Sequence, residues 1–390
     1  MKKTNLVIWC VITVLLIWGC VDLLDVSPAE KEFPVQEVDL QLRTVYPTAV
    51  EFVWNKEPSN FFRDYRLYFD TLPEITSEVQ PYKVTYFKND TTLKITGLEP
   101  QQTYYIKLVT SSYSESKSSG VISFETDSVT AGDITGETLG KMVRVPAGSF
   151  MTKKGEIATI TYDFYIDSVP VTEALWDQVM GDGQSQSLLP KVEVSWFEAV
   201  LFCNVKSKSM GLDTSYIYDT VFYGAGDSVV VHLQNLRFDL HSNGFRLPTE
   251  DEWEYACRAG STTDFFWGKD LPDRFEIVEW SQEDTLMVSD YVWWILDEVW
   301  DRQPVAQKLP NPWGLYDILG NVNEFVWDII DYNRPGKRID YTGTIQGNQR
   351  VLRGGAFNHE LESITSDFRV SMSPSNKNDL VGFRTVRVID

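Results

Sequence analysis

The sequence predicts a multidomain protein in which an all-β sandwich is followed by an irregular α+β domain. Residues 36–127 contain short stretches of period-two hydrophobic alternation separated by turn residues, which is typical of antiparallel strands. From residue 141 onward the pattern changes to short capped helices, short strands and long loops rich in aromatic residues. Residues 128–140 are rich in Gly, Thr, Ser and Asp and are typical of a linker. We therefore expect domains at 36–127 and 141–390.

The N-terminus predicts a leader peptide and a lipid anchor. Two lysines precede an apolar run, Leu6 to Trp18, that is short for a membrane span. The run ends in the sequence Ile-Trp-Gly-Cys, which resembles a bacterial lipobox, where a small residue before the cysteine permits lipidation and cleavage. The resemblance implies a signal peptide at 1–19, a lipidated Cys20, a tether at 20–35 and a location in the bacterial cell envelope. The membrane would then hold the protein by its lipid anchor only. The alternative is an ordinary signal anchor in which Cys20 has no role.

The first domain should be an antiparallel sandwich. Alternating segments begin near Val38, Val50, Tyr65, Thr92 and Tyr104, and they are long enough for one strand each. The segment resembles a fibronectin type III module, whose early core tryptophan corresponds to Trp54. Its corner before the penultimate strand, where a tyrosine hydroxyl ties back to the backbone, corresponds to the residues Leu98, Pro100, Thr103 and Tyr105. Such modules are usually spacers or docking surfaces, so we expect a structural role for Tyr105.

Three helices can be placed in the second domain. Ser195 and Glu198 form a capping-box pattern, and Thr249 and Glu252 form another. A third helix is expected over 172–180, where Gly181 follows the last apolar residue.

Several ordered motifs resemble the formylglycine-generating enzyme (sulfatase-modifying factor) family. They are GFRLPTEDEWEYACRAG at 244–260, NPWGLYDILGNVNEF at 311–325, RVLRGGAF at 350–357 and GFRTVRV at 382–388. The resemblance covers about residues 141–388. It implies an irregular α+β fold related to C-type lectins. It also implies a catalytic centre in which a cysteine pair holds copper. With this copper the enzymes of the family oxidise a cysteine of a client sulfatase.

The copper-binding cysteine pair of that family is absent. His359 stands where the first cysteine belongs, and Ile364 or Thr365 stands where the second belongs. Copper(I) prefers soft thiolate ligands, which none of these side chains supplies. Cys203 and Cys257 lie on predicted helices far earlier in the motif order. We therefore expect no copper and no catalytic residue of the family's kind.

A second enzymatic branch of the same scaffold holds iron with three histidines. The chain has only His232, His241 and His359, with no His-x-x-x-His spacing. We expect these histidines to be surface or hydrogen-bonded residues.

The resemblance also implies a structural calcium site. In the family it lies around a Gly-Asn-x-x-Glu turn, which maps to Asp317 and Glu324 as carboxylate ligands and to Gly320 and Val322 as carbonyl ligands. Calcium prefers such hard oxygen ligands. The alternative is a turn without metal, in which Glu324 only pairs with a nearby donor.

Charge and polarity restrict the partners. The net charge is −21, which disfavours binding to nucleic acid. A polar or glycan ligand, or a protein of the envelope, is compatible with this charge. The polar loop after the Arg-Gly-Gly motif is the expected partner-facing segment, represented by Asn358, His359, Asn376 and Asn378. An ordinary solvated loop is the alternative.

Three functions follow from these observations. The one we favour is a non-catalytic envelope lipoprotein, in which the second domain is a ligand-binding or protein-binding assembly module on a fibronectin-like spacer. The second is an oxidoreductase of the formylglycine-generating type that modifies a client sulfatase or another substrate through an atypical site. The third is a binding protein diversified at asparagine codons, for which the few terminal asparagines are weak support.

Overall fold

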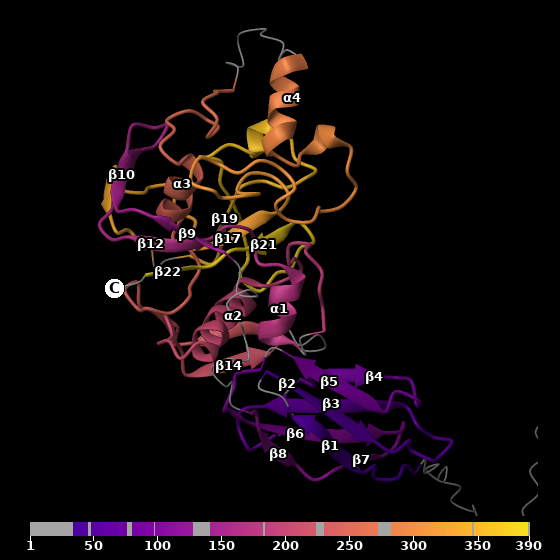
Figure 1. Cartoon of the computed structure of the whole chain (residues 1–390). Helices are drawn as coiled ribbons and strands as arrows, with labels where there is room; N and C mark the ends of the chain where they lie inside the picture. The colour runs from indigo at the N-terminus through magenta and orange to yellow at the C-terminus, as the bar shows by residue number, and fades with distance from the viewer. Residues whose placement is uncertain are drawn as a thin grey trace, which may run out of the picture.

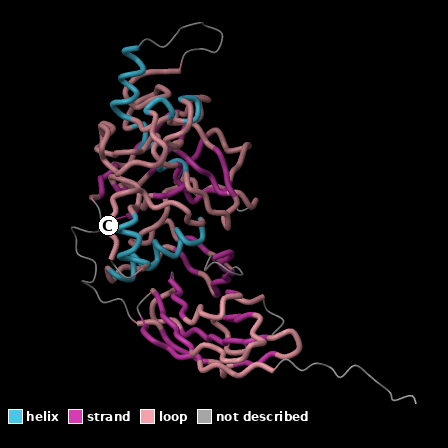
Figure 2. Tube along the Cα trace, turned by 90° about the vertical axis from the view of Figure 1, so that its right-hand side faces the viewer, coloured by secondary structure: helices cyan, strands magenta, loops and turns pink. Residues whose placement is uncertain are grey.

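The protein consists of an N-terminal β part and a larger mixed part above it (Figure 1). The computed structural model describes residues 34–45, 48–75, 80–96, 98–127, 141–181, 184–223, 230–271, 282–344 and 347–388. We call residues 34–127 the sandwich and residues 141–388 the head. Figure 2 shows that the helices are confined to the head. The predicted signal peptide and Cys20 lie outside the described residues.

Two sheets form the sandwich. One sheet, in the order β1-β2-β5, consists of β1 (Leu40–Val45), β2 (Ala49–Trp54) and β5 (Thr92–Thr96). The other sheet, in the order β4-β3-β6-β7 with β8 also paired to β6, consists of β4 (Lys83–Thr85), β3 (Asp64–Asp70), β6 (Thr103–Ser111), β7 (Ser116–Ser118) and β8 (Ile122–Glu125). All pairings are antiparallel, as the alternation in the sequence predicts.

A single apolar core joins the two sheets. Trp54 belongs to this core with 4% exposure, which confirms its expected place. The corner tyrosine is Tyr104 and not Tyr105. The Tyr104 hydroxyl accepts a hydrogen bond from the backbone N–H of Glu99 at 2.9 Å, and its ring is fully buried. Residues two apart share a face of a strand, so Tyr104 lies on the core face with Ile106.

The described part of the head contains four helices. They are α1 (Glu173–Met180), α2 (Trp196–Ser209), α3 (Glu250–Arg258) and α4 (Gln282–Tyr291). Both predicted capping boxes are present, at Ser195 before α2 and at Thr249 before α3. Thr172 caps α1 through its side chain. The fourth helix, α4, was not expected from the sequence.

The head has one four-stranded sheet near its centre. Its order is β20-β19-β17-β21, and its strands are β17 (Asn323–Ile329), β19 (Arg350–Arg353), β20 (Val370–Met372) and β21 (Val381–Phe383). Beside it lies a three-stranded sheet of β9 (Met142–Val145), β12 (Phe164–Asp167) and β22 (Val386–Val388). The chain thus returns from its last residues to pair with strands near the start of the head.

The remaining strands of the head are short. Three form a mixed sheet of β10 (Gly148–Met151), β11 (Ile157–Ile160) and β18 (Lys337–Ile339). The others form two pairs, β13 (Tyr216–Ile217) with β16 (Arg237–Phe238) and β14 (Thr220–Tyr223) with β15 (Val230–Gln234). Two 3₁₀ turns, Ile295–Asp297 and Leu361–Ser363, complete the elements. Within the described residues, no helix combines the length and apolarity that crossing a bilayer requires.

Candidate functional site

The position of the family's cysteine pair is a packed turn in this chain. Strand β19 ends at Arg353, and Gly354 and Gly355 follow with φ of 92° and 77°. A Cβ at Gly355 would lie 2.5 Å from the carbonyl oxygen of Ser363, so only glycine fits where the turn returns on itself. Ile364 beyond it is fully buried in the apolar core of the head. Ile364, one of the two candidates for the second cysteine position, therefore serves as a core residue in this chain.

His359 is held by the backbone of the same turn. Its N–H donates to the carbonyl of Ala356 at 2.9 Å, and its Nδ1 accepts from the N–H of Ala356 at 3.3 Å. Burial lowers the pKa of His359, so the imidazole is favoured in its neutral form. The described residues bring no group of three or more His, Cys, Asp or Glu side chains together in a way that could hold a metal ion.

The two cysteines among the described residues lie in helices, and both are free thiols. Cys203 on α2 and Cys257 on α3 are fully buried in two different core clusters. Burial raises the pKa of the Cys257 thiol to about 12, and it raises the pKa of the Cys203 thiol as well. Neither side chain is a thiolate at neutral pH, so neither is ready to act as a nucleophile or copper ligand.

The turn expected to bind calcium is held by internal hydrogen bonds. The Glu324 carboxylate accepts from Arg384 Nη2 at 2.7 Å and from Trp253 Nε1 at 2.8 Å. One oxygen of Asp317 accepts from the N–H of Ala306 at 2.7 Å. A guanidinium at the carboxylate of Glu324 already balances its charge and takes its lone pairs. Glu324 therefore does not fit the calcium set that the family resemblance implies.

Gly320 and Val322 serve the packing of this turn. Gly320 has φ of 75°, and a Cβ there would lie 2.3 Å from the carbonyl oxygen of Trp293. Val322 is fully buried. The contacts agree with the alternative in which Glu324 pairs with a nearby donor. Metal titration can test the calcium site that the family resemblance implies, and these contacts lead us to expect no effect of calcium.

The motif arginines are interior ion-pair partners. Arg353 donates from Nη2 to Glu254 at 2.7 Å, and Arg246 donates to both carboxylate oxygens of Glu252 at 2.6 Å. All four side chains are almost completely buried. They fix α3 to the strands around it, and they do not reach the surface to bind a ligand.

The four residues expected to face a partner fall on two loops. Asn358 is exposed on the Gly-Gly turn, where the carbonyl of His359 accepts from the N–H of Ile295 at 3.2 Å. Asn376 and Asn378 are exposed in the loop before β21, and the carbonyl of Asn378 accepts from the N–H of Glu193 at 3.0 Å. No hydrogen bond recorded among the described residues links the two loops.

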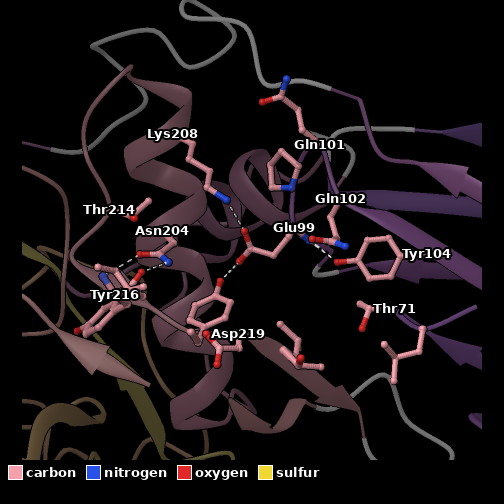
Figure 3. Close-up of a pocket in the computed structure, with 16 residues that line it drawn as sticks. Thr71, Glu99, Gln101, Gln102, Tyr104, Asn204, Lys208, Thr214, Tyr216 and Asp219 are labelled. Carbon is pink, nitrogen blue, oxygen red and sulfur yellow. Dashed lines mark hydrogen bonds and ion pairs between the residues drawn. The ribbon is translucent and has the colours of Figure 1, made fainter. Parts of the chain in front are cut away.

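A pocket that sequence reasoning missed lies between the sandwich and the head (Figure 3). Its volume is about 580 Å³. Glu99 of the sandwich points into it and pairs with Lys208 Nζ of α2 at 2.6 Å. The hydroxyl of Tyr218 donates to the other carboxylate oxygen of Glu99. These two contacts also tie the sandwich to the head.

The wall of this pocket is mostly polar. Figure 3 places amide and hydroxyl side chains around Glu99, among them Gln101, Gln102 and Asn204. Such groups suit hydrogen bonding to a neutral polar ligand. The lining residues come from segments more than 100 positions apart, such as Gln101 and Asp219, so no local motif could reveal the pocket.

Comparison with known proteins identifies the head. Residues 130–389 match the family described as sulfatase-modifying factor enzyme 1-like domain. Chaperone protein LppX of Paenibacillus barcinonensis is 30% identical over 259 residues, which cover 63% of this chain and 89% of that protein. The formylglycine-generating enzyme of Thermomonospora curvata is 35% identical over 142 residues, which cover 35% of this chain and 46% of the enzyme.

A solved structure agrees with this assignment. Treponema denticola variable protein 1 superposes with a TM-score of 0.51 at 27% identity, covering 64% of this chain and 95% of that protein. The head thus shares its fold with that protein. The chain belongs to the sulfatase-modifying factor enzyme 1-like family.

Proposed function

We propose that the chain is a lipid-anchored protein of the bacterial cell envelope whose head is a non-catalytic binding and assembly module. The sandwich, as a fibronectin type III-like module, serves as its spacer, and acylated Cys20 holds it to the membrane. The observation that carries this proposal is the packed turn at His359 and Ile364, where the family's copper-binding cysteines would lie.

A role in assembly rests on three further observations. The relative that matches over most of its length carries the name of a chaperone. The motif arginines and acids pair with one another inside the fold, so their role in this chain is structural. The exposed Asn358 and Asn376 loops and the polar pocket at Glu99 remain as surfaces for an envelope protein or a glycan.

The alternative, oxidation of a client through an atypical site, has less support. Such chemistry needs an activated thiol, a metal or a base with a free carboxylate or imidazole. In the described residues the two thiols are buried, and Glu99 already accepts from Lys208 and Tyr218.

The first experiment measures copper(I) affinity against a chromogenic competitor. We expect no binding by the wild-type protein. The matched control is the double variant His359→Cys with Ile364→Cys, which places two thiols on the same turn and supplies the missing soft ligands. Tight binding by the wild-type protein, or oxidation of a cysteine-containing sulfatase peptide by it, would contradict the proposal.

A second experiment tests which loop contacts a partner. A photo-crosslinking residue is placed at Asn358 or at Asn376 in cells, with Tyr332, which is 83% exposed, as the control position. We expect a discrete protein or glycan adduct from at least one asparagine position and none from Tyr332. Absence of adducts from both loops would argue against either of them as the partner-facing surface.

A further inference from the structure

One end of the sandwich carries exposed aromatic side chains. The loops after β2, after β4 and after β6 expose Phe61 by 42%, Tyr86 by 69%, Phe87 by 73% and Tyr113 by 80%. We call these four residues the aromatic tip. Strand registers place all three loops at the same end, because Asp64 pairs with Ser111 and Tyr65 pairs with Thr85. Exposed rings gathered at one end of a domain point to an interaction surface.

The loops of the tip are fixed to one another. Lys88 Nζ lies 3.5 Å from a carboxylate oxygen of Glu57, and it donates to the carbonyl of Ser59. Arg63 donates from its backbone to the carbonyl of Ser111 at 2.8 Å, and its guanidinium lies 5.9 Å from the Tyr113 ring centre. The aromatic side chains are therefore presented by a braced surface rather than by independent loops.

The chain enters the sandwich at this same end. The N–H of Gln36 donates to Glu57 at 3.0 Å, and the N–H of Asp39 donates to Asn55 at 2.8 Å. The opposite end, with Glu99 and Gln101, faces the head. The described chain starts at Pro34, 14 positions after Cys20. Covalent geometry limits the reach of those positions, so an acylated Cys20 keeps the tip within about 50 Å of the bilayer.

We propose that the aromatic tip rests on the phospholipid surface that holds the acyl chains of Cys20. This inference rests on the proposed lipid anchoring. Tyrosine and phenylalanine rings favour the boundary between headgroups and hydrocarbon, where the ring is desolvated and the hydroxyl stays in water. The lipid anchor and the aromatic tip lie at the same end and act as two linked contacts with the membrane. Once the acyl chains are inserted, the tip is held close to the bilayer, so its contact adds to the affinity of the anchor.

The orientation of the whole protein follows from this contact. Strands β3 and β6 run from the tip to the junction with the head, so the long axis of the sandwich stands away from the bilayer. The Asn358 and Asn376 loops belong to the head, which joins the sandwich at the end opposite the tip.

The test uses the full lipidated chain in nanodiscs of phosphatidylethanolamine and phosphatidylglycerol. An environment-sensitive fluorophore is attached to Tyr113→Cys or, as the matched control, to Leu72→Cys at the opposite end of the sandwich. Leu72 is 58% exposed. Cys203 and Cys257 are buried, and acylated Cys20 has no free thiol, so only the introduced cysteine reacts. We expect a blue shift and quenching by nitroxide-labelled lipids at position 113 and neither effect at position 72.

A second variant links the effect to the rings. With Tyr86→Ser and Phe87→Ser added, the label at position 113 should lose most of its blue shift and lipid quenching, while circular dichroism stays unchanged. Equal, weak quenching at positions 113 and 72 in nanodisc-bound protein would overturn the inference and leave a protein or glycan as the occupant of the tip. Failure of the wild-type chain to enter nanodiscs at all, with no effect of Cys20→Ser, would instead refute the lipid anchor.

Discussion

Arg384 and Glu324 lie side by side in the head with no exposure to solvent. Arg384 also donates to the carbonyl of Asp167 at 3.0 Å and to that of Tyr316 at 3.1 Å. The pair thus joins β17, the segment after β21 and the turn before β17. Loss of one partner leaves a buried charge without compensation, which costs much more than an exposed ion pair contributes.

We predict that Arg384→Met lowers the free energy of unfolding by about 3–5 kcal/mol. The control is Arg144→Met, because Arg144 pairs with Asp163 while 60% of its side chain is exposed. That change should cost no more than about 1 kcal/mol. Urea titrations followed by tryptophan fluorescence measure both values, and equal losses in the two variants would show that the buried pair has no special role.

Asp328 is a buried acid beside other acids. Burial and the nearby Glu250 carboxylate raise its pKa to about 7 from an ordinary value of 3.8. Arg334 opposes this shift, and Asp251 adds to it. The folded protein therefore keeps a proton on Asp328 at a pH where the unfolded chain has released it.

The consequence for stability has a defined sign. Between about pH 4 and pH 7 the unfolded chain binds fewer protons at this site, so the free energy of unfolding should fall as pH rises and then level off. In Asp328→Asn the side chain cannot titrate, so this variant should lose the part of the pH dependence of the free energy of unfolding that Asp328 contributes. Chemical denaturation at a series of pH values measures it, and identical profiles for the two proteins would contradict the shifted pKa.

At the scale of elements, the hairpin β14–β15 joins the head to the sandwich. Tyr223 on β14 belongs to the head but packs against the sandwich core, with its ring centre 5.7 Å from that of Phe69 in an edge-on arrangement. Lys208 and Tyr218 add the two contacts to Glu99. The junction therefore combines an aromatic contact with a partly buried ion pair.

Removal of the Tyr223 ring should loosen the two parts. We expect Tyr223→Ala to cost about 1–3 kcal/mol and to split thermal unfolding into two transitions, one for each part. Phe222→Ala is the control, because Phe222 directly precedes Tyr223 on the same strand and is 44% exposed. Differential scanning calorimetry distinguishes the two patterns, and a single unchanged transition in Tyr223→Ala would mean that the ring does not couple the parts.

The elements also show what the sequence could and could not reveal. The capping boxes at Ser195 and Thr249 act within four residues, so α2 and α3 were predictable from local chemistry. The sequence prediction assigned the corner tyrosine to Tyr105 and not to Tyr104. In the structure Tyr104 lies on the buried face of β6, together with Ile106 two positions later. Helix α4 was missed because its support is tertiary, with Val288 and Val292 buried against the rest of the head.

Sites differ from elements in this respect. The missing cysteine pair could be read from motif order, because it depends on residue identity alone. The role of Glu324 could not be predicted in this way. A carboxylate in a turn can bind a calcium ion or pair with a guanidinium, and Arg384 lies 60 positions away in sequence. The pocket at Glu99 could not be predicted either, because its walls come from both the sandwich and the head.

At the scale of the whole molecule, the calcium prediction can be tested directly. Because Arg384 and Trp253 already satisfy Glu324, we expect EDTA to leave the melting temperature unchanged and added calcium to have no effect. Thermal melts in chelated buffer, with and without excess calcium, measure this. A melting temperature that rises with calcium and saturates would instead support the site that the family resemblance implies.

The C-terminal strands have a consequence for the order in which the protein folds. Strand β22 pairs with β12, and β21 pairs with β17, so the last residues of the chain complete two sheets of the head. Phe164 and its partner Val388 are more than 200 positions apart, whereas the strand pairs of the sandwich lie within a much shorter stretch. During synthesis the sandwich can therefore form while the head is still incomplete. Until Arg384 is added, the buried Glu324 carboxylate lacks its guanidinium partner, so a chain stalled before Arg384 carries a complete sandwich and an incomplete head.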